Sequence, residues 1–287
     1  MTPLRRQGFF KIVWRVLYPI GIHFVIADII MGFVLIALAK VFGGYEEAYR
    51  KFAILLTGSA AVIAIPIGVL LYTGDVKRRK FGGIFRKETV KGLTVGKTLL
   101  MFLMGTGLAI IGNMLVLLIG NLVNLSEYVE SMGNITENQP FLLLIFCVGI
   151  LGPLAEEILF RWLVYLRMRD LSKSIWIPIL VSSLLFGIYH GNLSQMVYAT
   201  VLGSVFAYSL EATGSLLAPV FLHMGANCLS TTWSYLPADI ESMLLCLLSS
   251  FIIGVLAMIL GFGFLRKRYA KRHDVLTEGS IEGTNPR

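Results

Sequence analysis

Long apolar segments separated by short polar ones dominate the pattern of this chain. Eight of them are predicted as membrane spans, because a helix needs about 20 mostly apolar residues to cross a bilayer. Their approximate ranges are 16–42, 52–73, 98–123, 140–165, 175–190, 195–211, 215–235 and 242–265. The fifth and sixth are short. The pattern therefore predicts an all-α fold, a polytopic membrane protein of about eight transmembrane helices, with any polar site in the bundle interior.

Charge along the chain predicts the orientation of these spans. Basic residues cluster at 5–15, 77–97, 161–173 and 266–272. The alternate loops carry acidic residues instead, namely Glu46, Glu47, Glu127, Glu130, Glu137, Asp239 and Glu241. Cytoplasmic loops are enriched in Lys and Arg, and eight spans place every basic cluster on one side. We therefore expect both termini to be cytoplasmic, in a multi-pass protein of the plasma (cell) membrane.

Composition supports the same class. The chain is 56% hydrophobic and 15% charged, with a mean hydropathy of +0.77, whereas soluble domains carry roughly 25% charged residues. The net charge of +8 lies in segments between spans, so we expect the lipid bilayer as a partner and no nucleic acid. The N-terminus resembles a signal peptide, but the apolar run 16–42 is longer than the ~7–15 residues of a signal core. An uncleaved first helix is predicted.

The chain divides into four predicted parts: N-terminal helices (1–139), a core (140–235), a last helix with a basic end (236–272) and a tail (273–287). The tail is rich in Gly, Thr and Glu and is predicted to be disordered. The cysteines lie in apolar segments and are interpreted as small buried residues without disulfides; they are Cys147, Cys228 and Cys246.

Two adjacent glutamates lie inside the fourth apolar segment, in L-G-P-L-A-E-E-I-L-F-R. A charge at membrane depth costs about 2.5–3.5 kcal/mol even on the lenient scale, so these residues are the first candidates for chemistry. Glu157 and Arg161 are spaced i, i+4 in the order that favours an ion pair, and we interpret them as a structural clamp. Glu156 points about 100° away, so we expect a carboxylate available as a general base. The alternative is that it only faces a water-filled cavity or another helix.

Two histidines, one at the end of the fifth apolar segment and one inside the seventh, add to the candidate site. His190 ends F-G-I-Y-H, and His223 opens H-M-G-A-N with Asn227 on the same helical face. Imidazole and carboxamide groups can donate together to a developing oxyanion. Each histidine alone is more typical of a helix–helix hydrogen bond. With the glutamates in the same half of the chain, the set indicates a catalytic site.

Other polar residues of the spans are interpreted as structural. His23 in the first span, and Asn113 and Asn121 in the third, are predicted to form interhelical hydrogen bonds. Gly105 and Gly107 indicate close packing of the third helix against its neighbours.

The motifs resemble those of the CAAX protease and bacteriocin-processing family, also called the Abi family, which includes the type II CAAX prenyl endopeptidases. Its motifs are E-E-x-x-x-R, F-x-x-x-H and H-x-x-x-N. Here they are Glu156-Glu157 with Arg161, Phe186 with His190, and His223 with Asn227. Any one motif is weak, but three in order within 140–235 are a strong signal.

The resemblance implies an intramembrane endopeptidase, a hydrolase in which Glu156 and His190 activate water. His223 and Asn227 would form the oxyanion hole, and the Glu157–Arg161 pair would order the site. The substrate would be a peptide or protein, such as a prenylated C-terminus, a bacteriocin-type leader or a transmembrane segment.

Three alternatives remain. Glu156, His190 and His223 could form a zinc set, although the favoured mechanism requires no cofactor. A non-enzymatic protein of the same fold, for bacteriocin self-immunity or as a scaffold, would need no intact motif set. Intramembrane Glu and His also occur in proton-coupled transporters, although no internal repeat is visible.

The depth of His190 raises a separate question. If the fifth span crossed fully, His190 would lie on the opposite side of the membrane from Glu156 and His223. Either this span begins later, or the fifth and sixth spans form a short pair that does not cross fully.

Overall fold

The computed structural model describes residues 8–81, 92–119, 133, 139–236 and 239–282. Within these ranges the chain is helical and has no strand, so the predicted all-α membrane fold is confirmed. The helices are α1 (Phe9–Val41), α2 (Tyr45–Phe81), α3 (Val95–Ile119), α5 (Phe141–Leu144), η2 (Ile145–Leu151), α6 (Gly152–Glu157), η3 (Ile158–Tyr165), α7 (Leu166–Leu171), α8 (Trp176–Tyr189), α9 (Leu193–Thr213), α10 (Leu217–Trp233) and α11 (Ile240–Glu282).

These helices match the eight predicted spans in order. The segments from α5 to α7 form one continuous helix, which we call the site helix (Phe141–Leu171). Six helices of the described chain are long and apolar enough to cross a membrane: α1, α2, α3, the site helix, α9 and α11. α8 has 14 residues, or about 21 Å at 1.5 Å per residue, against roughly 30 Å of hydrocarbon. The fifth span therefore does not cross fully.

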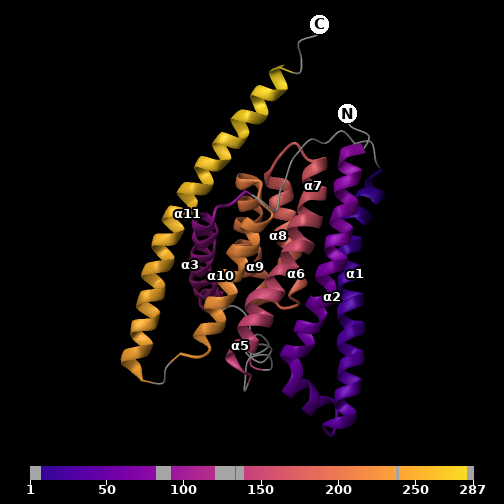
Figure 1. The fold of residues 1–287 in the computed structure, drawn as a ribbon, viewed down its shortest axis with the longest axis vertical. Helices are drawn as coiled ribbons and strands as arrows, with labels where there is room; N and C mark the ends of the chain where they lie inside the picture. Colours follow the sequence, from indigo (N-terminus) through magenta and orange to yellow (C-terminus); the bar gives the residue numbers. More distant parts are fainter. Residues whose placement is uncertain (1–7, 82–91, 120–132, 134–138, 237–238, 283–287) are drawn as a thin grey trace.

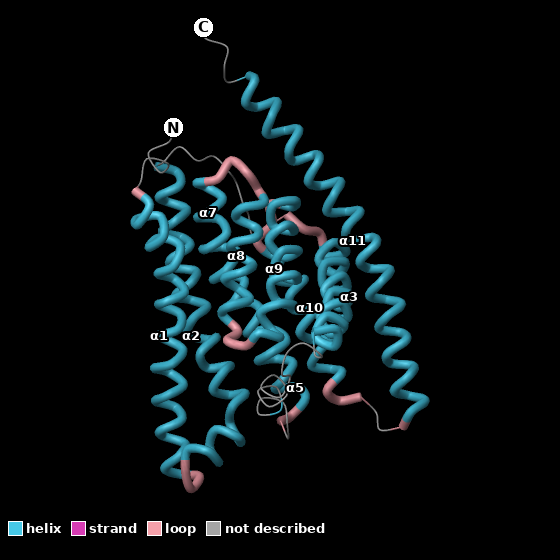
Figure 2. Tube along the Cα trace, turned by 180° about the vertical axis from the view of Figure 1, so that it is seen from behind, coloured by secondary structure: helices cyan, strands magenta, loops and turns pink. Residues whose placement is uncertain are grey.

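The helices form an elongated bundle in which α11 runs obliquely along one outer side (Figure 1). The start of α1 and the end of α11 lie at the same end of the bundle, which we call the basic end (Figures 1 and 2). The last turn of α2 carries Arg78, Arg79 and Lys80 at this end as well. The α1–α2 turn, beside Glu46 and Glu47, lies at the opposite end. The structure therefore separates the charges as the sequence predicted.

Glycines bring α3 into direct backbone contact with its neighbours. A Cβ on Gly105 would lie 2.0 Å from the Leu222 carbonyl oxygen, and one on Gly225 would lie 1.9 Å from the Phe102 carbonyl oxygen. Gly107 meets Gly254 of α11 in the same way. The close packing predicted for the third helix is confirmed, and it fixes the part of α10 that carries the H-M-G-A-N motif.

A tight turn inside the bundle explains the position of His190. His190 is the C-cap of α8, Gly191 has φ of +76°, and the Asn192 side chain accepts a hydrogen bond from the Gln195 amide at 2.8 Å as the N-cap of α9. Glycine at a helix end and asparagine at a helix start are the usual residues for such a reversal. Figure 2 shows this turn well inside the length of the bundle. The option of a short pair is therefore borne out for the fifth span, α8, but not for the sixth, because α9 is long enough to cross.

Two predictions need correction. α11 continues to Glu282, so the tail predicted as disordered is helical over 273–282, while 283–287 lies outside the described residues. No proline interrupts this stretch. Cys246 is exposed on the outer side of α11 rather than buried, whereas Cys147 is buried; all three cysteines are free thiols.

Candidate active site

The site helix is interrupted by wider turns on both sides of the two glutamates. η2 and η3 are π-helical and flank α6, and π-helical turns are rare and frequent at functional sites. Pro153 has no N–H, so it cannot bond to the Gly149 carbonyl four residues earlier. The Gly152 N–H bonds to Cys147 instead of Val148. Two carbonyls of the helix, those of Val148 and Gly149, are therefore open to other partners.

α10 supplies both partners. Asn227 Nδ2 donates to the Val148 carbonyl at 3.0 Å, and Cys228 Sγ donates weakly to the Gly149 carbonyl at 3.7 Å. A buried carbonyl without a partner is costly, so these contacts tie α10 to the widened turn. Asn227 therefore lies in the site as predicted, but one of its two N–H groups is already engaged.

The predicted Glu157–Arg161 ion pair is present and fully buried. Arg161 Nη1 lies 3.1 Å from Glu157 Oε1, and both side chains have 0% exposure. His223 Nδ1 donates to the same Oε1 at 2.8 Å. Because a carboxylate only accepts, this hydrogen bond places a proton on Nδ1. The other ring nitrogen, Nε2, takes no part in this hydrogen bond. Glu157 thus orients the imidazole of His223 as well as Arg161.

Aromatic rings and a glycine complete the surroundings of Arg161. Its guanidinium carbon lies 4.5 Å from the Phe186 ring centre and 5.4 Å from that of Phe206. Nη2 donates to the Gly203 carbonyl at 3.0 Å. A Cβ on Gly203 would lie 2.7 Å from this nitrogen, so only glycine fits there. Phe206 also stacks on His223, with ring centres 4.9 Å apart.

Glu156, in contrast, faces a cavity of about 530 Å³ inside the bundle. Its side chain is 22% exposed, and its Oε2 lies 3.7 Å from His223 Nε2. His190, His223 and Asn227 line the same cavity. The structure therefore brings the predicted catalytic residues together from three helices, while Glu157 and Arg161 lie behind them. This volume is in the usual range for ligand sites.

His190 is held by its own helix and by an aromatic neighbour. Its Nδ1 donates to the Phe186 carbonyl at 2.9 Å, because a carbonyl can only accept.

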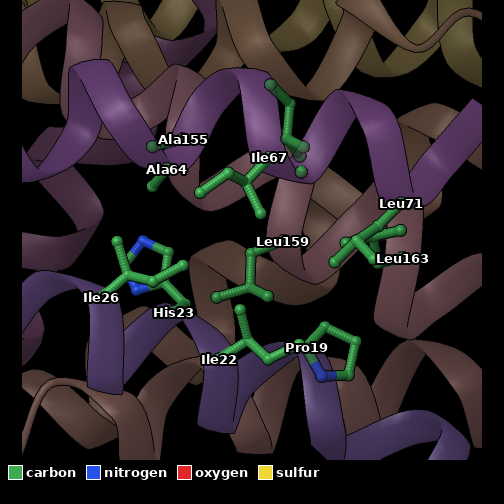
Figure 3. A pocket seen from close by; sticks show the side chains of 12 residues that line it. Pro19, Ile22, His23, Ile26, Ala64, Ile67, Leu71, Ala155, Leu159 and Leu163 are labelled. Carbon is green, nitrogen blue, oxygen red and sulfur yellow. The ribbon is translucent and has the colours of Figure 1, made fainter.

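The adjacent Tyr189 hydroxyl makes a 3.1 Å hydrogen bond with His23 Nδ1 of α1. The interhelical role predicted for His23 is confirmed. Figure 3 shows His23 beside a small apolar cavity of about 20 Å³ between α1, α2 and the site helix, which is large enough for about one water molecule.

The alternative zinc set fits the structure less well. Glu156, His190 and His223 line one cavity. Among the residues that the structure describes, however, no three His, Cys, Asp or Glu side chains are gathered as a metal site. Metal dependence of this site stays a prediction.

Sequence reasoning missed two residues of this site. Gly203 carries no motif, and its role depends on the crossing of α9 and the site helix. Asn113 was predicted to bond to another helix, but its side chain lines the cavity and makes no hydrogen bond within the described residues. Asn121 lies outside the described residues.

Comparison with known proteins gives two matches to this region. Residues 138–229 match the family described as type II CAAX prenyl endopeptidase Rce1-like. A protein of Bacillus subtilis (strain 168), described as "Putative membrane peptidase YdiL", is 30% identical over 112 residues, covering 36% of this chain and 46% of the relative. The chain thus matches about half of that relative's length. No solved structure matches the chain.

Fold and site together define a class: a polytopic helical membrane protein with Glu, His and Asn side chains gathered around an internal cavity. All three motifs fall within the matched range. The region that carries these motifs is therefore similar to the type II CAAX prenyl endopeptidase Rce1-like family, and the chain is similar to a membrane peptidase.

Proposed function

We propose that this protein is an intramembrane endopeptidase that hydrolyses a peptide bond with a water molecule activated by Glu156 and His190. One observation carries the proposal: Glu156, His190, His223 and Asn227, from three different helices, line a single cavity. The family match supports peptidase chemistry in the same region.

In the proposed reaction, Glu156 takes a proton from water as the water oxygen bonds to the substrate carbonyl carbon. The negative charge on the carbonyl oxygen is met by His223 through Nε2, when that nitrogen is protonated, and by the second N–H of Asn227. Collapse of this intermediate breaks the C–N bond, and Glu156 returns its proton to the leaving amine. His190 helps to hold the water. Glu157 and Arg161 act as positioning residues, because Glu157 fixes the ring of His223.

The substrate class extends this proposal. A prenylated C-terminal peptide, a leader or bacteriocin-type peptide, or a membrane peptide each suits a cavity within the bilayer. We also propose that both termini are cytoplasmic in the plasma membrane and that the reaction needs no metal. Activity that persists after chelation and dialysis is the expected result, whereas loss of activity restored by zinc would contradict the metal-free mechanism.

The experiment that tests the function compares peptide termini in membranes that carry the wild type or Glu156→Gln, by mass spectrometry. The amide keeps the shape of the side chain but cannot take up a proton, so we expect termini that vanish in the variant. Glu46→Gln is the matched control, because Glu46 is an exposed glutamate at the end of α2 remote from the basic end. Identical termini in all three samples, at equal expression, would reject the proteolytic function.

A further inference from the structure

The cavity extends from the site in one direction only along α10. Its lining on this helix continues from His223 through Asn227 and Ser230 to Ser234. These positions lie on one face at spacings of three or four residues. His223 is buried, whereas Ser230 and Ser234 are exposed. At ~1.5 Å per residue, this lining is roughly 16 Å long, and its exposed end marks the mouth.

The direction of α10 relates this mouth to the two ends of the bundle. The turn before α10 lies at the basic end, because a Cβ on Gly214 would touch the Arg272 guanidinium of α11. The residue that follows Ser234, Tyr235, donates to the Gln139 carbonyl just before the site helix begins. α10 therefore leads from the basic end toward the opposite end, and the mouth lies at the opposite end.

Packed side chains close the other direction. Immediately behind Glu156 lie the fully buried Glu157–Arg161 pair and the ring of Phe206. Nearer the basic end, Arg167 pairs with Asp75, and Arg79 lies 2.9 Å from Asp170. All of these side chains are nearly inaccessible. A peptide could not reach Glu156 from the basic end without breaking these contacts.

The route from the mouth is lined mainly by apolar side chains, with neutral polar groups among them. Thr57, Asn113, Gln195 and Thr231 line it beside the serines of α10, and no Lys, Arg or Asp is among its described lining residues. The carboxamide of Asn113 makes no hydrogen bond in the described structure. Hydroxyl and amide groups of this kind suit an uncharged, extended peptide backbone, which offers both donors and acceptors.

Lys and Arg mark the cytoplasmic side of a membrane protein, so the mouth faces away from the cytoplasm. We propose that the substrate is an uncharged peptide segment on the non-cytoplasmic side of the membrane, which reaches Glu156 through this mouth with Asn113 bonding its backbone. This inference rests on the proposed function for the identity of the occupant, but the route can be tested without any cleavage assay.

The test is thiol labelling from each side of the membrane. In a variant with Cys147, Cys228 and Cys246 changed to Ala, Ser234→Cys reports on the mouth. Two exposed positions outside the site serve as controls: Glu47→Cys at the acidic turn and Lys271→Cys at the basic end. Each is treated with a membrane-impermeant maleimide in intact cells and in inside-out vesicles.

We expect Ser234→Cys and Glu47→Cys to label in intact cells, and Lys271→Cys to label only in inside-out vesicles. Labelling of Ser234→Cys from the cytoplasmic side, from both sides, or from neither side would overturn the proposed route. If the expected labelling occurs but termini do not depend on Glu156, the route holds and the proteolytic function fails. If cleavage occurs, complete labelling with a bulky maleimide should abolish it, and persistent cleavage would show that substrate enters elsewhere.

Asn113 is tested as a positioning residue for the substrate once a cleaved sequence is known. Loss of one neutral hydrogen bond in Asn113→Ala should raise KM roughly 3- to 10-fold with little change in kcat. Met114→Ala is the control, because Met114 is 55% exposed on the same helix outside the cavity lining. Unchanged KM in Asn113→Ala, or an equal effect in Met114→Ala, would remove Asn113 from the proposal.

Discussion

The two adjacent glutamates allow a matched test of the buried clamp. Glu157→Gln leaves the Arg161 guanidinium without a charged partner, although Arg161 is 0% exposed and its Nε and Nη1 make no hydrogen bond in the described structure. Over the 3.1 Å between Nη1 and Oε1, the Coulomb attraction at an effective dielectric constant of about 20 is roughly 5 kcal/mol. Removing one partner of a buried ion pair typically lowers the free energy of unfolding by about 3–5 kcal/mol.

We therefore expect Glu157→Gln to lower the free energy of unfolding by about 3–5 kcal/mol. The midpoint of thermal unfolding should fall by roughly 6–20 °C. Glu156→Gln makes the same chemical change one residue away, on a side chain that is 22% exposed in the cavity, and should change stability by less than about 1 kcal/mol. The assay is thermal unfolding of both variants in the same detergent, followed by circular dichroism.

Equal midpoints for Glu157→Gln and Glu156→Gln would refute the clamp. A double variant, Glu157→Gln with Arg161→Met, tests whether the two side chains stabilise the protein as a pair. Because it removes the unpaired charge, it should regain part of the stability that the single variant loses. If the double variant loses the sum of the two single losses, the two side chains do not act as a pair.

Two further predictions concern parts of the fold that hold the site. Gly203→Ala should displace Arg161, since the added methyl group would lie 2.7 Å from its Nη2; cleavage and thermal midpoint should both fall, whereas Gly263→Ala, with nothing within 4 Å, should leave both unchanged. Asp75→Asn leaves the buried Arg167 guanidinium without its carboxylate and should cost about 3–5 kcal/mol; an unchanged midpoint in thermal unfolding would contradict this estimate.

The spans and the motif residues could be predicted because their signals are local. Hydropathy defines a span from its own residues, and the Glu157–Arg161 pair follows from one helical turn. The short α8–α9 reversal was also within reach, since Gly191 and Asn192 are typical residues for ending and starting helices.

The remaining features depend on contacts between distant segments. Arg167 and Asp75 are 92 residues apart, so the sequence showed basic clusters at one end but not that some of their members are buried in ion pairs. The role of Gly203 appears only when α9 crosses the site helix. The bond from Asn227 to Val148 depends on the register of a π-helical turn, for which Pro153 was the available signal.

The π-helical turn η2 also explains why the neighbouring residues Glu156 and Glu157 lie in different environments. On a rigid helix, consecutive side chains point about 100° apart, so Glu157 can face Arg161 and His223 while Glu156 faces the cavity. The direction of both depends on how the helix is wound before them, and η2 alters that winding. Asn227 and Cys228 bond to the carbonyls that this change leaves open. The contact between α10 and η2 therefore holds His223 and Glu156 in register. A loop could not keep this orientation against the cost of burying the Glu157 carboxylate.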